Sequence, residues 1–210
     1  HELFTELEFK TLIKSKVDKS TAKSKPTEPP DALKKEPPKL KNINASYECI
    51  LKETELDALI KKLSKAKLIA LDTETDGLDF TTAELVGISL SAKEGEGAYI
   101  PISHDYDEAP QQLTKELVLK KLKPLLEKVP IVGQHIKFDR NVLSQHGLEL
   151  NNIESDSMLM SYVLDSTATR HNLDAMAKFY LNYEATSYEE VAGKGVKQIT
   201  FNNVELETAT

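Results

Sequence analysis

Two acidic residues, Asp72 and Glu74, stand at the end of a short apolar run, and this pair constrains the fold more than any other feature of the chain. Residues 68–71 are Leu-Ile-Ala-Leu, which predicts a buried strand over residues 68–72. Residues two apart on a strand point to the same side of a sheet. The sequence therefore aims two carboxylates at one point on a sheet edge.

Two carboxylates held close together in a low dielectric repel each other, so the arrangement needs a counter-charge or a bound proton. A divalent cation supplies that counter-charge, and ligands that are all oxygen suit Mg²⁺ or Mn²⁺. The alternative is that Asp72 caps the turn that follows while Glu74 is solvated. The pair alone does not decide between these two interpretations.

A third carboxylate, Asp139, falls on the apolar side of a predicted helix. The helix spans residues 135–146 and ends at Gly147, a residue favoured just after the last turn. Its apolar stripe consists of Ile136, Val142 and Leu143. The same spacing places Asp139 on that stripe, where a carboxylate is costly unless it is paired or binds a metal. Lys137 and Arg140 could pair with it, but both lie on other faces of the helix.

Composition and charge limit the class of protein. The single cysteine, Cys49, excludes a disulfide framework and a cysteine-based zinc site, and it fits a reducing compartment. No stretch has the length and apolarity of a membrane span or a signal peptide. The net charge is −7, and it divides into −3 over residues 1–9, +6 over residues 10–41 and −10 over residues 42–210. A domain this acidic does not bind nucleic acid by bulk counterion release. If it acts on a polyanion, metals and a few local contacts must overcome the general repulsion.

We expect three parts along the chain. Residues 1–13 show large apolar residues at near-helical spacing and resemble the tail of a preceding domain. Residues 14–42 are rich in Lys, Pro, Ser and Thr and cannot bury a core, which predicts a flexible linker. Its lysines could touch DNA, but we interpret the linker as a solvated tether. Residues 43–210 hold the folded domain. Because the chain starts without Met and ends in what looks like an unfinished helix, we expect a piece of a longer polypeptide.

The folded part is predicted to be α/β, with a three-strand antiparallel meander. Strands are expected at residues 47–51, 68–72, 85–91, 98–102 and 129–133. Helices are expected at residues 114–128, 135–146, 155–164 and 173–181, and from residue 203 onward. A further helix is predicted to start at Thr54 as its N-cap, with Asp57 in the capping-box position. Residues 191–200 are expected to form a loop.

Several motifs resemble a known family. Residues 71–76 (Leu-Asp-Thr-Glu-Thr-Asp) resemble the first motif of the DEDD family of 3′–5′ exonucleases, and residues 133–140 (Gly-Gln-His-Ile-Lys-Phe-Asp-Arg) resemble its second motif. Residues 99–106 and 192–195, together with Arg170 and His171, resemble the proofreading domain of bacterial DNA polymerases. The resemblance runs in order over residues 45–210.

The resemblance implies a ribonuclease H-like mixed sheet flanked by helices, and hydrolysis of the 3′-terminal phosphodiester of DNA with two divalent cations, Mg²⁺ or Mn²⁺. On this basis Asp72 bridges both cations, Glu74 helps to hold the first and Asp139 reaches the second. One cation would lower the pKa of the attacking water, and the other would stabilise the leaving oxygen. The cations would also supply the positive charge that an acidic domain lacks.

The resemblance also implies contacts with a single-stranded 3′ end of DNA. Leu78 would wedge against the terminal base, although it could equally pack within its turn. Tyr188 would stack on a base, or it could be a half-buried loop residue. Arg170 would meet a phosphate, or it could be a charge at a helix start.

Three further positions lie in or next to the second motif. Gln134 could contact the DNA strand or cap the helix that follows. His135 and Phe138 stand where common family members carry Asn and Tyr, so their polar contacts are left open. The isolated His104 and His146 are interpreted as ordinary surface or turn residues.

The third motif of the family, a Tyr followed four residues later by an Asp, is expected just beyond Thr210. We therefore expect the parent enzyme to be competent, and the 210-residue chain to bind metal weakly and to hydrolyse DNA poorly. The implied neighbours are a 5′-nuclease domain before residue 43 and a polymerase domain after the chain. The implied location is the bacterial cytoplasm, at the nucleoid.

Two other functions were weighed. One is an exoribonuclease like ribonuclease D, which shares the first two motifs. The other is a non-catalytic module that binds single strands or supports a polymerase. The presence of Asp72, Glu74 and Asp139 together weighs against a non-catalytic module.

Overall fold

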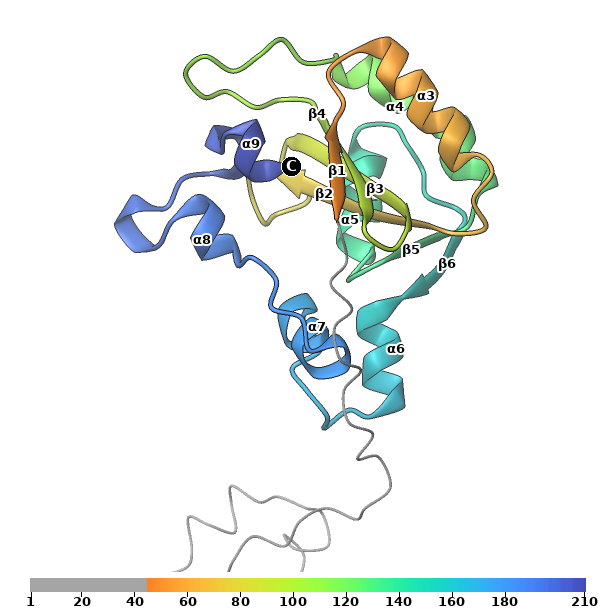
Figure 1. Ribbon diagram of the computed structural model, residues 1–210, viewed down its shortest axis with the longest axis vertical. Helices are drawn as coiled ribbons and strands as arrows, with labels where there is room; N and C mark the ends of the chain where they lie inside the picture. Colours follow the sequence, from red (N-terminus) through yellow and green to blue (C-terminus); the bar gives the residue numbers. More distant parts are fainter. Residues whose placement is uncertain (1–44) are drawn as a thin grey trace, which may run out of the picture. The chain divides into compact units, whose positions relative to one another are not determined.

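A six-stranded mixed sheet forms the centre of the domain (Figure 1). The computed structural model describes residues 45–210, which all belong to one compact unit. In sheet order the strands are β1 (Ser46–Cys49), β4 (Glu96–Pro101), β3 (Leu85–Lys93), β2 (Ile69–Thr75), β5 (Ile131–Gly133) and β6 (Ile153–Asp156).

The predicted meander is confirmed, because β2, β3 and β4 pair antiparallel. The other strands pair in parallel: β1 with β4, β5 with β2, and β6 with β5. β6 was not predicted, since residues 155–164 were assigned to a helix. Instead, the strand ends at Asp156 and α6 (Ser157–Leu164) follows at once. The Asp156 carboxylate accepts hydrogen bonds from the main-chain N–H groups of Met158 and Leu159, so this residue caps α6.

Three helices bury their apolar sides in the main core. α3 (Glu53–Leu63) and α4 (Lys115–Lys128) pack against each other, and α5 (Lys137–Gln145) contacts β2 (Figure 1). The buried side chains of α3 are Leu56, Leu59 and Leu63. Pro124 lies inside α4. These helices and the inner strands share one hydrophobic cluster, which fixes α5 against β2.

The predicted start of α3 is wrong. The helix begins one residue before Thr54, its N-cap is Lys52, and the residue that completes the capping box is Glu55. The Glu55 carboxylate accepts hydrogen bonds from the main-chain N–H groups of Leu51 and Lys52. Glu55 and Asp57 are both acidic residues near the start of the helix, and either could bind back to the N-terminal N–H groups. The sequence pattern therefore predicts the helix but not its first residue.

The C-terminal part of the chain forms α7 (Leu173–Leu181), α8 (Tyr188–Ala192) and α9 (Leu206–Ala209), with short 3₁₀ turns η1 (Gly195–Lys197) and η2 (Phe201–Asn203) between α8 and α9. A second, smaller apolar cluster attaches this part to β3 and β4. Its buried members are Val86, Tyr99, Ala192, Phe201, Val204 and Leu206. The C-terminus consequently lies beside the end of β2 (Figure 1).

His104 contradicts its interpretation as a surface residue, because only 5% of it is exposed. Residues 201–206 cover it from far along the chain, which local sequence does not reveal. His146, in contrast, is the partly exposed C-cap of α5, and Gly147 follows it at φ 81°, as a helix-ending glycine does. Among the described residues, no helix is long and apolar enough to span a membrane.

Candidate active site

Asp139 lies directly against β2, at the residue that separates Asp72 and Glu74 in the first motif. The main-chain N–H of Thr73 donates to Asp139 Oδ1 at 2.8 Å, and the Thr73 hydroxyl donates to the same oxygen at 2.7 Å. Only 3% of Asp139 is exposed, so it faces protein as its place on the apolar stripe predicted. The parallel pairing of β5 with β2 explains the approach, because α5 starts next to the end of β2.

Thr73 was not singled out from the sequence. Strand alternation turns its side chain away from the side of Asp72 and Glu74, and it is buried. Because Thr73 donates both its main-chain N–H and its hydroxyl to the same oxygen, it fixes the orientation of the Asp139 carboxylate. The only sequence signal for this role was a small polar residue between two acidic ones.

The three carboxylates influence one another electrostatically. Loss of hydration in the fold raises the pKa of Asp72 to about 7, with a smaller contribution from the charge of Asp139. The same loss of hydration, followed by the charges of Asp72 and Asp139, raises the pKa of Glu74 to about 8. Burial also raises the pKa of Asp139, although the hydrogen bonds from Thr73 oppose that rise. The three side chains therefore form one acidic group in which negative charge is unfavourable without a cation.

This donor set suits a hard divalent cation. Within residues 45–210, no ion pair joins any of the three carboxylates to a Lys or Arg side chain, so their repulsion has no cationic partner from the protein. In the same residues, no three His, Cys, Asp or Glu side chains are already arranged around one point as metal ligands. The residues present fit an oxygen-bound cation in type and charge, and their side chains would have to draw together to hold it.

An open hollow of about 380 Å³ lies beside Asp72. Its wall includes Ser89 and Tyr99 from the meander, Gln134 and Ser157 from the other side, and Thr210 at the C-terminus. Much of the lining is apolar, and it runs over the sheet from β4 to β5. The hollow is open to solvent and gives access to Asp72.

Two of the predicted DNA contacts are accessible near the carboxylates. Leu78 follows β2 and is 94% exposed, so it does not pack within its turn. Tyr188 opens α8 and is 48% exposed, with its ring stacked on Phe201 at 6.4 Å between centroids. Burial and the charge of Glu74 raise the pKa of Tyr188, which places this ring near the acidic group.

The second-motif positions are held within the protein to different degrees. Gln134 donates to the main-chain oxygen of His171 at 2.8 Å and accepts from the Ser157 hydroxyl, so it caps no helix. His135 is exposed, has a left-handed φ of 56°, and donates its N–H to Asp156 at 3.1 Å. Phe138 is partly buried against the main core. Asp156, which the sequence did not suggest, thus fixes the turn before α5 as well as the start of α6.

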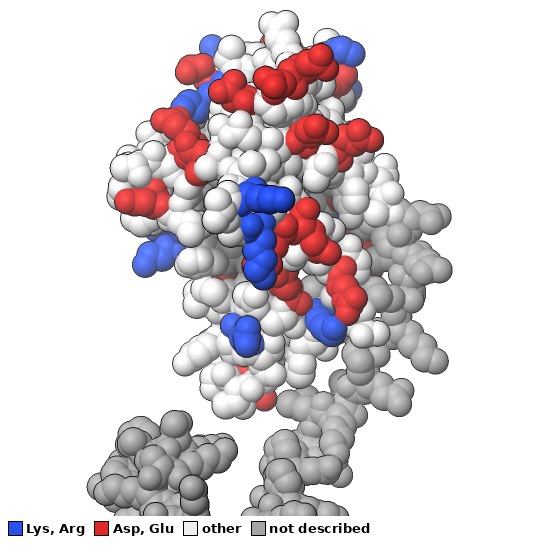
Figure 2. All heavy atoms as spheres, turned by 90° about the vertical axis from the view of Figure 1, so that its left-hand side faces the viewer, with Lys and Arg blue, Asp and Glu red and all other residues white. Residues whose placement is uncertain are grey.

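Arg170 is exposed just before α7. No ion pair involves its guanidinium within the described part of the chain. Figure 2 shows one face of the molecule, on which Asp and Glu side chains are widely spread among fewer Lys and Arg side chains. The role of Arg170 in DNA binding stays a prediction.

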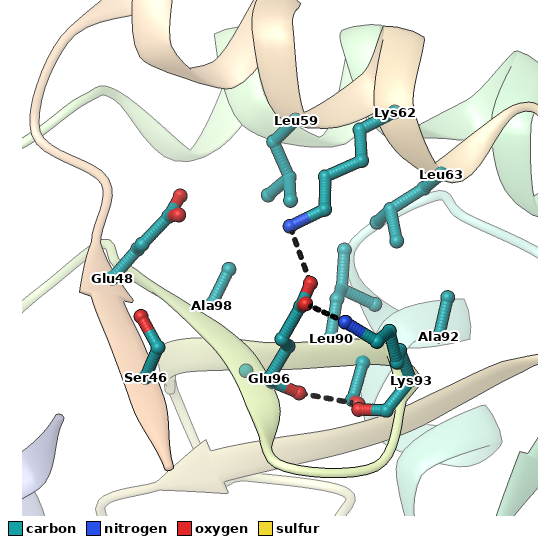
Figure 3. Close-up of a pocket in the computed structure, with 12 residues that line it drawn as sticks. Ser46, Glu48, Leu59, Lys62, Leu63, Leu90, Ala92, Lys93, Glu96 and Ala98 are labelled. Carbon is teal, nitrogen blue, oxygen red and sulfur yellow. Dashed lines mark hydrogen bonds and ion pairs between the residues drawn. The ribbon is translucent and has the colours of Figure 1, made fainter. Parts of the chain in front are cut away.

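A second hollow, of about 220 Å³, lies between α3 and the β3–β4 hairpin and contains none of the three carboxylates (Figure 3). Lys62 reaches Glu96 at 2.9 Å, and Lys93 binds the same carboxylate. Hydrogen bonds from Lys93 and Lys62 lower the pKa of Glu96 to about 2. These charges satisfy one another, so this hollow is a structural junction rather than a catalytic site.

Comparison with known proteins identifies the family. The sequence pattern of a 3′–5′ exonuclease family matches residues 47–206, a span that includes all three carboxylates. The chain belongs to this 3′–5′ exonuclease family. The exonuclease domain is similar to DNA polymerase I of Pseudomonas aeruginosa, with 48% identity over 78% of this chain and 18% of the relative. It is also similar to DNA polymerase I of Borreliella burgdorferi, with 40% identity over 80% of this chain and 18% of the relative. The chain thus spans 18% of the length of these relatives.

Solved structures share the fold of the exonuclease domain. Ribonuclease D of Trypanosoma brucei superposes with a TM-score of 0.56 at 14% identity, covering 69% of this chain and 50% of that one. Ribonuclease D of Escherichia coli gives 0.53 at 20% identity, covering 69% of this chain and 36% of that one. The ribonuclease H-like α/β fold expected from the sequence is confirmed. At these identities the likeness concerns the fold alone.

Proposed function

We propose that this domain removes nucleotides from the 3′ end of single-stranded DNA and does so as the proofreading part of a DNA polymerase I-like chain. The observation that carries the proposal is the hydrogen bonding of Asp139 to Thr73, the residue between Asp72 and Glu74 on β2, which brings the third acidic residue to the strand that holds the other two. The family match supports the reaction, and the names of the relatives support the larger chain.

Asp72, Glu74 and Asp139 are the residues that would hold Mg²⁺ or Mn²⁺. A divalent cation there offsets negative charge on the phosphate and lowers the pKa of a water molecule. Asp72 and Glu74 carry protons near neutral pH without it, because their pKa values are about 7 and 8. Cation binding would release those protons, so affinity for the cation should rise with pH.

The neighbouring side chains would bind and orient the strand. Leu78 is free to press against the terminal base, and the exposed part of the Tyr188 ring can stack on a base. Arg170 can contact a phosphate, because no ion pair among the described residues occupies its guanidinium. Phe138 supports α5 from the core side, so its contribution to binding would be indirect.

A nuclease assay tests the proposal. A single-stranded oligodeoxynucleotide labelled at its 5′ end is incubated with Mg²⁺ or Mn²⁺, and products are separated by length. Because the chain spans 18% of the length of its relatives, the assay is run on the 210-residue chain and on an extended form of the relatives' length. With the extended form we expect a ladder that shortens from the 3′ end, and we expect Asp72→Ala and Asp139→Ala to abolish it. Intact substrate with the extended form would contradict the proposal.

The same assay separates the alternatives. An RNA oligonucleotide of the same sequence should be cut far more slowly than DNA, whereas an enzyme like ribonuclease D would prefer RNA. A non-catalytic module would bind the oligonucleotide without shortening it, and Asp72→Ala would then change nothing.

A further inference from the structure

We propose that residues 99–106 form a clamp that positions Tyr188 for stacking on a substrate base, with His104 as the central positioning residue. This inference rests on the proposed function, because it concerns how the same site receives a DNA strand. Within residues 99–106, the residues that form the clamp are Tyr99, His104, Asp105 and Tyr106.

Three consecutive residues of the clamp hold the segment that follows α8. His104 Nδ1 bonds the main-chain oxygen of Val204 at 2.8 Å. The main-chain N–H of Asp105 donates to the oxygen of Asn202 at 2.7 Å. The N–H of Leu206 donates to the Tyr106 hydroxyl at 3.3 Å. Residues 202–206 are therefore tied to the end of β4 by three hydrogen bonds from a stretch about a hundred residues earlier.

The partners of His104 fix its tautomer. A carbonyl oxygen can only accept, so Nδ1 carries the proton that is donated to Val204. Nε2 is then an acceptor, and the Tyr99 hydroxyl donates to it at 2.6 Å. The Gln112 amide holds the main-chain N–H and C=O of His104, each at 2.8 Å. Both ring nitrogens and both main-chain polar groups of His104 are thus hydrogen-bonded, so the ring has one orientation.

Tyr99 connects the clamp to the acidic group. Gly87 pairs with Glu74 across the β2–β3 ladder. The Tyr99 ring lies over Gly87, because a Cβ built on this glycine would be only 2.1 Å from the Tyr99 hydroxyl. The ring therefore covers β3 at the residue that pairs with Glu74. In addition, η2 contacts β2 directly. The clamp is consequently built onto the part of the sheet that carries the first motif.

A series of aromatic contacts leads from the clamp to Tyr188. The His104 ring lies against Phe201 at 5.9 Å between centroids, tilted by 60°. Phe201 is buried and stacks on Tyr188 at 6.4 Å, with 24° between the ring planes. Tyr188 remains half exposed, so Phe201 supports it from the protein side while the rest of the ring faces solvent. Tyr188 is the first residue of α8, a helix of five residues that the second apolar cluster holds at its other end through Val191 and Ala192. Phe201 is therefore the contact that supports the ring itself.

A double-mutant cycle tests the inference. Binding is measured in an Asp72→Asn background, which the proposed function expects to bind DNA without cutting it. The probe is an oligodeoxythymidylate with the fluorescent base 2-aminopurine at its 3′ end, because stacking on an aromatic ring quenches this base. The variants are His104→Phe, which keeps a ring but loses both side-chain hydrogen bonds, Tyr188→Ala, and the two together. His146→Phe is the matched control, since His146 lies outside the clamp.

We expect Tyr188→Ala to weaken binding by about 5-fold to 100-fold and to relieve the quenching. His104→Phe should weaken binding by about 3-fold to 10-fold with partial relief, and it should add less than about 2-fold when Tyr188 is already Ala. His146→Phe should change neither signal. If His104→Phe fails to fold, Tyr99→Phe, which removes only the donor to Nε2, should show the same dependence on Tyr188 with a smaller loss.

Two results would overturn the inference while leaving the proposed function intact. One is an equal loss from His104→Phe with and without the Tyr188 ring. The other is unchanged binding and quenching in His104→Phe although Tyr188→Ala weakens both. If the Asp72→Asn parent does not bind the probe and the extended form does not shorten DNA, the proposed function itself is wrong.

Discussion

At the scale of single residues, Asp72 and Glu74 make the stability of the metal-free domain depend on pH. Their folded-state pKa values of about 7 and 8 lie above those of the unfolded chain. The stabilisation from their bound protons is therefore complete below about pH 4 and is lost as the pH rises through 7 and 8. We expect Asp72→Asn and Glu74→Gln to raise the melting temperature at pH 8 by a few degrees and to have no such effect at pH 4.

Thermal unfolding with a chelator at the two pH values measures this effect. Glu154→Gln on β6 is the control, because this side chain is exposed and lies outside the acidic group. Added Mg²⁺ should stabilise the unaltered protein at pH 8 and the amide variants much less, since ligand binding stabilises only the form that binds. Amide variants that melt lower than the unaltered protein at pH 8 would show that the carboxylates do not repel each other.

Thr73 offers a second test at the residue scale. Thr73→Val removes the hydroxyl that donates to Asp139 at 2.7 Å but leaves the main-chain donor. We expect a loss of about 1–3 kcal/mol in the free energy of unfolding, measured with urea. Because that bond lowers the pKa of Asp139, its loss should also move the acidic limb of the pH–activity profile to higher pH. Thr73→Ser should restore both properties, and a profile that moves to lower pH would contradict the assigned role.

At the scale of elements, the sequence predicted the strands and helices whose formation depends on neighbouring residues, and it missed those that depend on distant ones. The apolar alternation and turn residues predicted β2, β3 and β4, and α7 was predicted at its observed residues. β6 was missed because its four residues contain one large apolar side chain, and only pairing with β5 makes it a strand. The burial of His104 could not be predicted either, since the residues that cover it lie about a hundred positions away.

The meander also contains a close approach that can be tested. Gly87→Ala would place a methyl group 2.1 Å from the Tyr99 hydroxyl, so Tyr99 must move. Overpacking of this kind should lower the free energy of unfolding by about 1–3 kcal/mol in a denaturant titration. Gly77→Ala is the matched control, because its methyl group would meet Ala83 at an ordinary 3.9 Å. Equal stability of the two variants would mean that Tyr99 is not fixed over β3.

At the scale of the whole molecule, the residue types of the candidate site were predictable while the contacts around them were not. The spacing of Asp72, Glu74 and Asp139 predicts an acidic group at a sheet edge, and in the structure Asp139 bonds Thr73 between the other two. Their role as metal ligands stays a prediction. The hydrogen bonds from Thr73, the turn held by Asp156 and the support beneath Tyr188 arise from contacts between distant segments. Residues of ordinary polarity make these contacts, so composition gives no sign of them.

The uneven charge of the chain leads to a final prediction, about salt. Residues 42–210 carry −10, and residues 10–41 carry +6. The basic residues lie mainly in the predicted linker, which we interpret as a solvated tether. Each phosphate contact with a single strand contributes about −0.7 to the slope of log affinity against log salt concentration. With only a few local contacts, we expect a slope no steeper than about −2, both for the whole chain and for a form that begins at residue 43. Fluorescence anisotropy of a labelled oligodeoxynucleotide measures both slopes. A slope near −4 that approaches zero in the shorter form would show that the lysines before residue 42 bind DNA directly.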